Sequence, residues 1–424
     1  MPRQLTLDKA AEILVQNSLA ITAARYGVDV ARAQRLIASL KPNPTVTLGA
    51  EQFDFIGSEV SRAFHDLITT NSNSAANRTY TFRYDQIIER GGKRKLRTEA
   101  ADLQLKVAEA QVLDATRQQL FALKQAFYNA VLARDNLRVA DENLYLINST
   151  EQLIKLHVET GDVAEGELIK FQSNKVQYQR DLVSSQLAYQ QAAREVLNIL
   201  GAEPKNVVGV VQTGGADQVP QLLADAPVDV IGHLKTEPLV ISAVELRQVA
   251  IDNRPDVIAA QRNVDAAQRS LDLAYALRHR DVDVAWEYQR LGSENTFGVV
   301  VSVPIFVHNN HQGEINQALA QLQQAKTQLA QIKLQAMTDV DKAYRAYETA
   351  EKMLQVYNSE ALQKSEEAFR IAGVSYREGA TSLLELRDAQ RTYNQTRVAA
   401  NQAQFDYRLS IYQLELATGK ELLK

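Results

Sequence analysis

The chain contains an internal duplication, which constrains its fold more than any other feature of the sequence. Residues 156–172 (LHVETGDVAEGELIKFQ) align with residues 374–390 (VSYREGATSLLELRDAQ), so that Gly161 falls on Gly379 at an offset of 218. Self-similarity over this distance indicates two copies of one structural unit. The predicted organisation is a first structural repeat, a small mixed equatorial linker region and a second structural repeat, over residues 1–200, 201–243 and 244–424.

Each copy has the same predicted elements in the same order: a helix, two strands, a very long helix, a glycine turn and a shorter return helix. Apolar residues recur at helical spacing, and the long helices carry a heptad seam, as in Ile315, Leu322 and Leu329. The predicted helices cover residues 8–40, 93–160, 164–200, 244–280, 312–378 and 382–418, and the predicted strands cover residues 45–53, 78–86, 281–289 and 296–306. Strands at one end and glycine turns at the other predict a rod.

The four strands have the length and alternation of strands that cross a bilayer in a barrel. Each has about 9–11 residues, and apolar or aromatic side chains alternate with polar ones. A soluble hairpin packed on a helix fits the same alternation. Four strands cannot close a barrel, and open sheet edges are not tolerated in lipid. Transmembrane strands would therefore require the chain to oligomerise, and three copies would supply 12 strands.

The composition excludes several classes of protein. The net charge of −4 gives no indication of nucleic-acid binding, and the absence of cysteine excludes disulfides and thiolate metal sites. No catalytic triad, phosphate-binding loop or pair of catalytic carboxylates is recognisable, so we expect neither an enzyme nor a cofactor. The start of the sequence, MPRQLTLDKA, lacks the apolar core of a signal peptide. It predicts either a cytosolic protein or one whose signal peptide has been removed.

Three stretches resemble the TolC family of bacterial outer-membrane efflux channels. Residues 84–97 (YDQIIERGGKRKLR) and 99–111 (EAADLQLKVAEAQ) are similar to its heavy-metal, CzcC- and CusC-like, branch, and the turn at 376–390 (YREGATSLLELRDAQ) is a specific feature of the family. The resemblance extends over nearly the whole chain. It implies a mainly α fold with a small β part, in a homotrimer. Four strands per chain would form a 12-stranded transmembrane β-barrel that continues into a long periplasmic α-helical barrel.

The resemblance also implies a function. The chain would be the outer-membrane exit duct of a tripartite efflux system, docked to a periplasmic adaptor and, through it, to an inner-membrane resistance-nodulation-division pump. It would conduct cargo passively, and heavy-metal cations are the expected cargo. An outlet for drug efflux or type I secretion is the alternative within this class. A soluble coiled-coil scaffold is a more distant alternative.

A basic turn lies where the second strand of the first repeat gives way to the long helix. Two glycines permit the bend, and the cations that follow are expected to lie near anionic lipid headgroups. A solvated basic turn with no lipid partner is the alternative. The residues of this predicted membrane-interface turn are Gly91, Gly92, Lys93, Arg94, Lys95 and Arg97.

The resemblance implies a periplasmic gate at the turns between the long and return helices. Glu385 and Asp388 match the gate carboxylates of the family and lie three residues apart, on one helix face. In a trimer each would form a ring of three like charges that favours cations. Tyr376 matches a tip tyrosine, Thr381 stands where TolC itself has an arginine, and Glu167 is the acidic counterpart in the first repeat. Ordinary solvated helix charges are the alternative interpretation.

The same turns are the expected docking tips for the adaptor, because small residues would let adaptor hairpins fit between helix pairs. The predicted docking residues are His157, Gly161, Asp162, Val163, Gly379, Ala380, Ser382 and Leu383. A metal site is not predicted. His308 and His311 form a pair in a turn, and His65 lies in a long loop, but six histidines and three methionines are too few for a metal relay.

Overall fold

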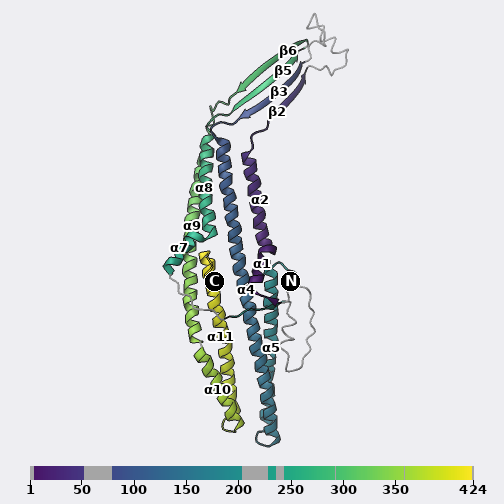
Figure 1. Ribbon diagram of the computed structural model, residues 1–424, viewed down its shortest axis with the longest axis vertical. Coiled ribbons are helices and arrows are strands. Elements are labelled where there is room, and N and C mark those ends of the chain that lie inside the picture. Colours follow the sequence, from purple (N-terminus) through teal and green to yellow (C-terminus); the bar gives the residue numbers. More distant parts are fainter. Residues whose placement is uncertain are drawn as a thin grey trace, which may run out of the picture. The chain divides into compact units, whose positions relative to one another are not determined.

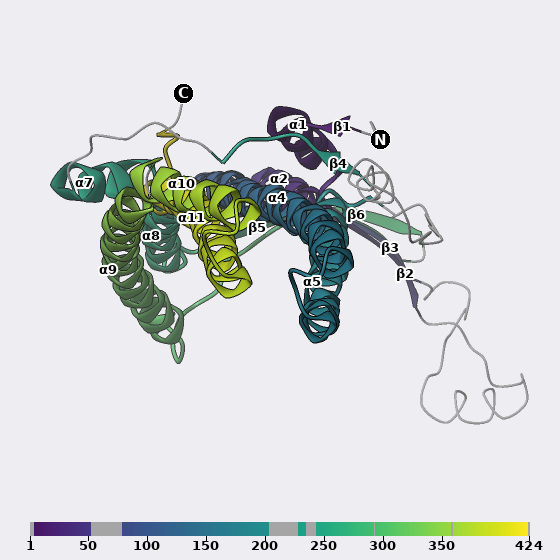
Figure 2. The same ribbon diagram turned by 90° about the horizontal axis from the view of Figure 1, so that it is seen from below.

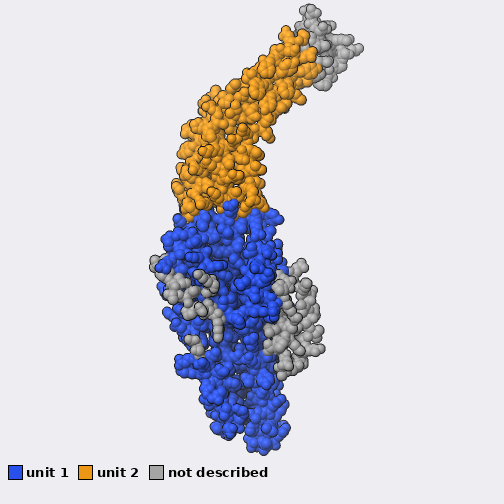
Figure 3. Space-filling view, viewed as in Figure 1, with its two compact units in different colours: residues 1–27, 109–259, 330–424 blue, residues 28–108, 260–329 orange. Residues whose placement is uncertain are grey.

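The computed structural model describes residues 4–51, 79–202, 228–234, 243–291, 293–357 and 359–422. It divides into two compact units, distinguished by colour in Figure 3: unit 1 comprises residues 1–27, 109–259 and 330–424, and unit 2 comprises residues 28–108 and 260–329. Both predicted repeats contribute to both units, and the division into repeats stays a prediction. Most of the predicted linker region, over 203–227 and 235–242, lies outside the described residues.

One antiparallel sheet in unit 2 contains all four predicted strands (Figure 1). The strands are β2 (Thr45–Glu51), β3 (Thr79–Ile88), β5 (Val282–Leu291) and β6 (Glu294–Ser302). Their order is β2-β3-β5-β6, so the central β3–β5 ladder joins one repeat to the other. The predicted end of the last strand at residue 306 is wrong, since β6 ends at Ser302. Pro304 follows, and proline has no N–H to donate to a strand ladder.

The helices follow the predicted order, with three breaks that the periodicity did not predict. The helix predicted over 8–40 is two helices, α1 (Leu7–Asn17) and α2 (Leu19–Ser39). Ser18 between them has an extended ψ of 121°, and its Oγ accepts a hydrogen bond from the backbone N–H of Ile21 at 3.5 Å. Side-chain capping of this kind satisfies an N–H that a new helix leaves without a partner.

The corresponding helix of the second repeat is also divided, into α7 (Ala243–Asn253) and α8 (Pro255–Ala276). Proline at the first helical position cannot continue a preceding helix but is well suited to start one. The long helix predicted over 312–378 consists of α9 (Gln312–Val356) and α10 (Ser359–Arg377). Its first-repeat counterpart, α4 (Lys93–Glu159), is continuous over 67 residues.

The return helices are α5 (Glu165–Ile199) and α11 (Leu383–Thr418), close to the predicted bounds. Seen along the helices in Figure 2, α4 lies with α5 and α10 lies with α11. The predicted seam is fully buried on α4 at Leu123, Ala130 and Leu137, whereas on α9 Leu322 is buried and Ile315 and Leu329 are half-buried. None of the described helices combines the length and the hydropathy that a membrane span requires.

A two-stranded parallel ladder in unit 1 was not predicted. It pairs β1 (Gln4–Leu5) with β4 (Asp229–Val230). Arg134 of α4 fixes the second strand by donating to the carbonyl oxygen of Val230 at 2.6 Å, and the hydroxyl of Tyr189 on α5 donates to Asp229 at 3.2 Å. The largest core cluster of unit 1 forms around this ladder from α1, α4, α5 and α11.

A buried carboxylate ties α4 to α5. Glu151 of α4 accepts from Lys175 of α5 at 2.7 Å, from Gln172 of α5 at 3.0 Å, and from Lys155 at 3.0 Å. These donors lower the pKa of Glu151 from 4.5 to about 2, and the hydrogen bond from Lys175 has the largest effect. Because its pKa is lower in the folded state, Glu151 stabilises the fold above its ordinary pKa.

We expect Glu151→Gln to lower the free energy of unfolding by about 2 kcal/mol at neutral pH, since it leaves two lysines around an uncharged group. The difference from the parent protein should shrink as pH falls from 4.5 toward 2, the window set by the two pKa values. Thermal unfolding followed by circular dichroism at several pH values measures it. Glu360→Gln is the matched control, because the Glu360–Lys364 pair is highly exposed and should contribute less than about 0.5 kcal/mol. Equal effects of the two substitutions, or a pH-independent difference, would contradict the assignment.

Candidate functional site

One face of the four-stranded sheet is apolar and exposed. In the strand register Leu48 lies opposite Phe82, Phe82 opposite Tyr288 and Tyr288 opposite Phe297, so these four side chains cross the sheet on a single face. Leu48 is 77% exposed and Phe297 is 74% exposed. Contiguous apolar surface of this kind marks a site of contact with a partner or a membrane. Other large apolar members of this face are Val46, Tyr80, Tyr84, Ile88, Trp286, Val299 and Val301.

The opposite face of the sheet is polar. Arg83 forms ion pairs with Asp85 at 2.7 Å and with Glu287 of the neighbouring strand at 3.5 Å. Thr81 and Gln289 lie opposite each other on the same face. The sheet therefore has one apolar face and one polar face, which is the alternation that the sequence predicted.

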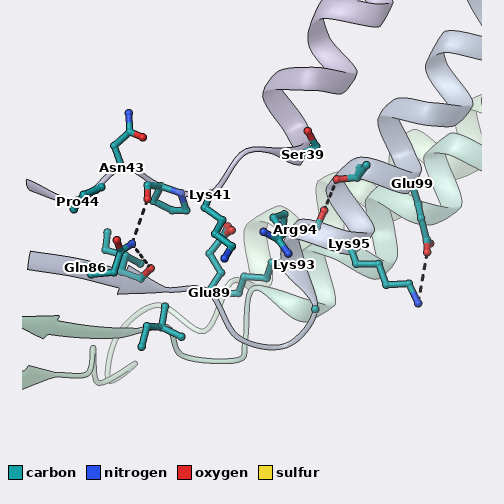
Figure 4. Close-up of a pocket in the computed structure, with 15 residues that line it drawn as sticks. Ser39, Lys41, Asn43, Pro44, Gln86, Glu89, Lys93, Arg94, Lys95 and Glu99 are labelled. Atoms are coloured by element: carbon teal, nitrogen blue, oxygen red, sulfur yellow. Dashed lines mark hydrogen bonds and ion pairs between the residues drawn. The ribbon is translucent and has the colours of Figure 1, made fainter.

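The basic turn begins α4 after two residues in the left-handed conformation, Gly91 with φ 72° and Gly92 with φ 71°. The structure divides the four predicted cations into two kinds. Lys93 is buried and pairs with Asp281 at 2.9 Å, and Arg97 pairs with Glu89 at 2.9 Å, so both hold the turn together. Arg94 and Lys95 are exposed (Figure 4).

The corresponding turn of the second repeat contains no lysine or arginine of its own, although Arg278 donates to Asn310 at 3.4 Å. His311 has a φ of 57°, immediately before α9 begins, as Gly92 does before α4. Its backbone N–H donates to Asn309 at 2.9 Å, its ring lies 3.2 Å from Glu314, and the ring of Phe306 is 5.0 Å away. These contacts give His311 a structural role. In the part of the chain that the structure describes, no group of three or more metal-ligating side chains forms a site, and His65 lies outside that part.

The two helix tips have the same backbone geometry, as the duplication predicts. Gly161 and Gly379 both have positive φ, at 84° and 70°. At the first tip the N–H of Asp162 donates to the carbonyl of His157 at 2.8 Å, and at the second the N–H of Ala380 donates to Ser375 at 2.8 Å. This six-residue hydrogen bond closes a helix around a left-handed residue. It places the predicted docking residues at two matching turns.

The docking residues differ in what their side chains do. Gly161, Asp162, Gly379, Ala380 and Ser382 are exposed. Val163 and Leu383 instead pack onto an apolar tip cluster, in which both helix hairpins take part. The buried members of the tip cluster are Ile147, Ile154, Phe171, Tyr376 and Leu386. The remaining docking residue, His157, is half-buried with its ring 6.2 Å from that of Tyr376.

The predicted gate residues form two groups. Tyr376 is buried, and burial, followed by the negative charge of Glu167, raises its pKa. Tyr376 of the second repeat shares the tip cluster with Leu168 of the first, the residue next to Glu167 in the chain. Thr381 donates a hydrogen bond from its hydroxyl to Glu385, whose backbone N–H donates to Ser382 at 3.3 Å as α11 begins.

The second group of predicted gate residues consists of Thr381, Glu385 and Asp388, and Glu385 lies one helical turn before Asp388. Both carboxylates are exposed on α11, and neither takes part in an ion pair within the described residues. They lie near the tip, so their charge is available to solvent. This arrangement suits a ring of negative charge rather than a structural ion-pair network.

Sequence reasoning missed a polar seam between α4 and α11. Arg397 pairs with Glu142 at 2.5 Å, and the side chain of Asn401 donates to Asn136 at 3.2 Å. The sequence does carry one signal of this seam, which is the presence of polar residues at inward positions of the heptad pattern. The partners lie more than 250 residues apart in the sequence, so the pattern alone could not pair them.

Comparison with known proteins agrees with this geometry. Residues 246–420 match the family model of the outer membrane efflux protein. The chain is 22% identical to the cobalt-zinc-cadmium resistance protein CzcC of Cupriavidus metallidurans, over 93% of this chain and 85% of that protein. The fold is similar to that of CusC, with a TM-score of 0.73 and 18% identity over 98% of this chain and 92% of that one. It is also similar to the Campylobacter jejuni CmeC outer membrane channel, with a TM-score of 0.75 and 15% identity over 99% and 87% of the two chains. The resemblance predicted from the sequence is therefore confirmed, as is a mainly α fold with a small β part.

The two glycines of the basic turn should differ in their response to alanine. Gly92→Ala should cost about 1 kcal/mol through the left-handed φ alone, since nothing lies near the added Cβ. Gly91→Ala should cost more, because its Cβ would meet the side chain of His279 at 2.7 Å. Both substitutions should lower the midpoint of thermal unfolding, and Gly91→Ala should lower it further.

Gly313→Ala provides the control. Gly313 lies in the first turn of α9, has open space around it and has no positive φ. Alanine there should leave the unfolding midpoint unchanged or raise it. If all three alanine substitutions lowered the midpoint equally, backbone conformation would not explain the glycines at 91 and 92.

Proposed function

We propose that this chain, which carries the outer membrane efflux protein domain over residues 246–420 and has the fold of TolC-family channels, is the outer-membrane exit duct of a tripartite efflux system. Three copies would form the channel, which conducts cargo passively from the periplasm to the outside. The observation that carries the proposal is the four-stranded sheet, with an exposed apolar face and an opposite face of paired charges. A bilayer around a water-filled pore requires that pair of faces.

The edges of the sheet support a trimer. Among the described residues β2 pairs only with β3, and β6 pairs only with β5. Backbone groups without partners at these edges would cost several kcal/mol each in lipid. If β6 of one copy pairs with β2 of the next, three copies close a ring of 12 strands, a size known among transmembrane barrels.

Heavy-metal cations are the proposed cargo. The support is the similarity along nearly the whole chain to CzcC, a protein named for cobalt, zinc and cadmium resistance. The exposed carboxylates Glu385 and Asp388 would form acidic rings that favour cations. These rings would pass cations without binding one tightly. Cargo selection would then belong to the inner-membrane pump, which this channel would reach through a periplasmic adaptor at the helix tips.

A growth panel tests the cargo. A strain that lacks this protein should be inhibited at lower concentrations of Zn, Co, Cd, Ni, Cu or Ag salts, and the parent gene should restore growth. Dyes, detergents and antibiotics are tested beside the metal salts. Sensitivity confined to these organic compounds would contradict the metal assignment and favour a drug-efflux outlet.

Charge removal at the gate tests the acidic rings. In planar bilayers the double variant Glu385→Gln, Asp388→Asn should lower the ratio of cation to anion permeability several-fold, because each substitution removes three charges from the proposed trimer. The control is Glu245→Gln, Asp252→Asn, which removes two exposed carboxylates from α7. An unchanged ratio in the gate variant, or an equal change in the control, would remove these carboxylates from the conduction path.

A further inference from the structure

A groove of about 1180 Å³ opens in unit 2 where β3 gives way to α4 (Figure 4). Three segments line it: the link between α2 and β2, the end of β3, and the first turns of α4. Figure 4 shows Lys41, Glu89, Lys93 and Arg94 gathered together, whereas Lys95 extends toward Glu99. Cations from two separate segments of the chain thus converge on one hollow.

The anions of the groove are already neutralised within unit 2. Glu89 pairs with Arg97 at 2.9 Å, and Glu99 lies 3.5 Å from Arg269. Asp281, just outside the lining, pairs with Lys93 at 2.9 Å.

Three cations remain available in the groove. Lys41 and Arg94 form no ion pair within the described residues, and both are exposed. Lys95 approaches Glu99 only at 3.9 Å, and its side chain is 82% exposed. The groove therefore carries an excess of positive charge, at a helix start where the macrodipole already disfavours cations. A bound anion would remove this repulsion.

The apolar face of the sheet leads into this groove. Ile88 lies opposite Val282 and shares the face of Trp286, and it is 50% exposed. Beyond Ile88 the side chains change from apolar to cationic within a few residues. A ligand with an anionic head and apolar tails matches both parts of this surface, whereas free phosphate matches only one.

We propose that this groove binds the phosphate of an anionic phospholipid, with Lys41, Arg94 and Lys95 contacting the phosphate oxygens and Ile88 contacting the acyl chains. Arginine suits the site because its guanidinium donates two parallel hydrogen bonds to a phosphate. The corresponding turn of the second repeat, residues 307–314 (VHNNHQGE), carries no lysine or arginine of its own. This inference rests on the proposed function, which places the sheet in the outer membrane.

The test uses the full chain reconstituted in nanodiscs that contain phosphatidylglycerol and phosphatidylcholine in equal amounts. Native mass spectrometry counts the lipids that stay bound after release from the nanodiscs, and channel conductance is recorded from the same purified protein in planar bilayers. The parent protein should retain phosphatidylglycerol in preference to phosphatidylcholine. A cation near an anionic lipid contributes roughly a fivefold change in affinity. Each of Lys41→Gln, Arg94→Gln and Lys95→Gln should therefore weaken retention about fivefold, and the triple variant should abolish the preference.

The matched control is the triple variant Lys106→Gln, Lys326→Gln, Lys352→Gln. It removes three exposed lysines that form no ion pair within the described part of the chain. This control should keep the preference for phosphatidylglycerol. Inorganic phosphate at millimolar concentration should not displace the lipid.

Three results would overturn the inference while leaving the channel intact: no lipid preference in a conducting parent protein, equal retention by the groove variant, or displacement of the lipid by inorganic phosphate. The last would identify a phosphate site instead of a lipid site. Failure of the parent protein to form a trimer in any nanodisc and to conduct in planar bilayers would have a different meaning. It would overturn the proposed function, and the lipid site would fall with it.

Discussion

The antiparallel pairing of β3 with β5 is the interaction on which the rest of unit 2 depends. It is the ladder through which strands from the two repeats become one sheet. Because side chains alternate along a strand, its register also decides which residues share a face. Tyr84 stacks on Trp286 at 5.8 Å on the apolar side, and Arg83 reaches Glu287 on the polar side. A slip of one residue would exchange the faces of one half and place charges among the aromatic rings.

Two of the four cations in the basic turn form ion pairs that hold the fold together, and the other two are exposed. Lys93 begins α4 and points back to Asp281, so its charge is compensated and its side chain is buried. Arg97, one turn later, caps the end of α2 by donating to the carbonyl of Ala38 at 2.9 Å. Lys95 is two residues from each of them, on the other side of the helix, whereas Arg94 is three residues from Arg97 and shares its side. Helical periodicity therefore separates Lys95 from the two structural cations, and Arg94 differs from them in being exposed and without an ion pair within the described residues.

Most of the fold could be predicted from the sequence, because periodicity and duplication are local signals. The strands β2, β3 and β5, the helix α4 and both return helices agree with the predicted order. The breaks at Ser18 and Arg254 could not be predicted from periodicity, since apolar residues continue in phase through them. The β1–β4 ladder is too short to carry a pattern of its own. The glycine turns could be predicted because glycine readily adopts a positive φ. The positive φ of His311 could not, because histidine seldom adopts this conformation and its presence does not indicate it.

Within a single chain, several backbone groups, apolar side chains and one hydroxyl have no partner among the described residues. The sheet has two edges without partners among the described strands, and its apolar face is open to solvent. At the tip, the hydroxyl of Tyr376 is buried without a hydrogen-bond partner among the described residues. A buried hydroxyl without a partner costs about 1–3 kcal/mol. The first two costs would disappear in the proposed trimer, through a neighbouring strand at the edges and lipid at the apolar face, whereas the tyrosine hydroxyl is enclosed by its own chain. Pairing of the open strand edges and burial of the apolar face would therefore both favour the proposed trimer over the monomer.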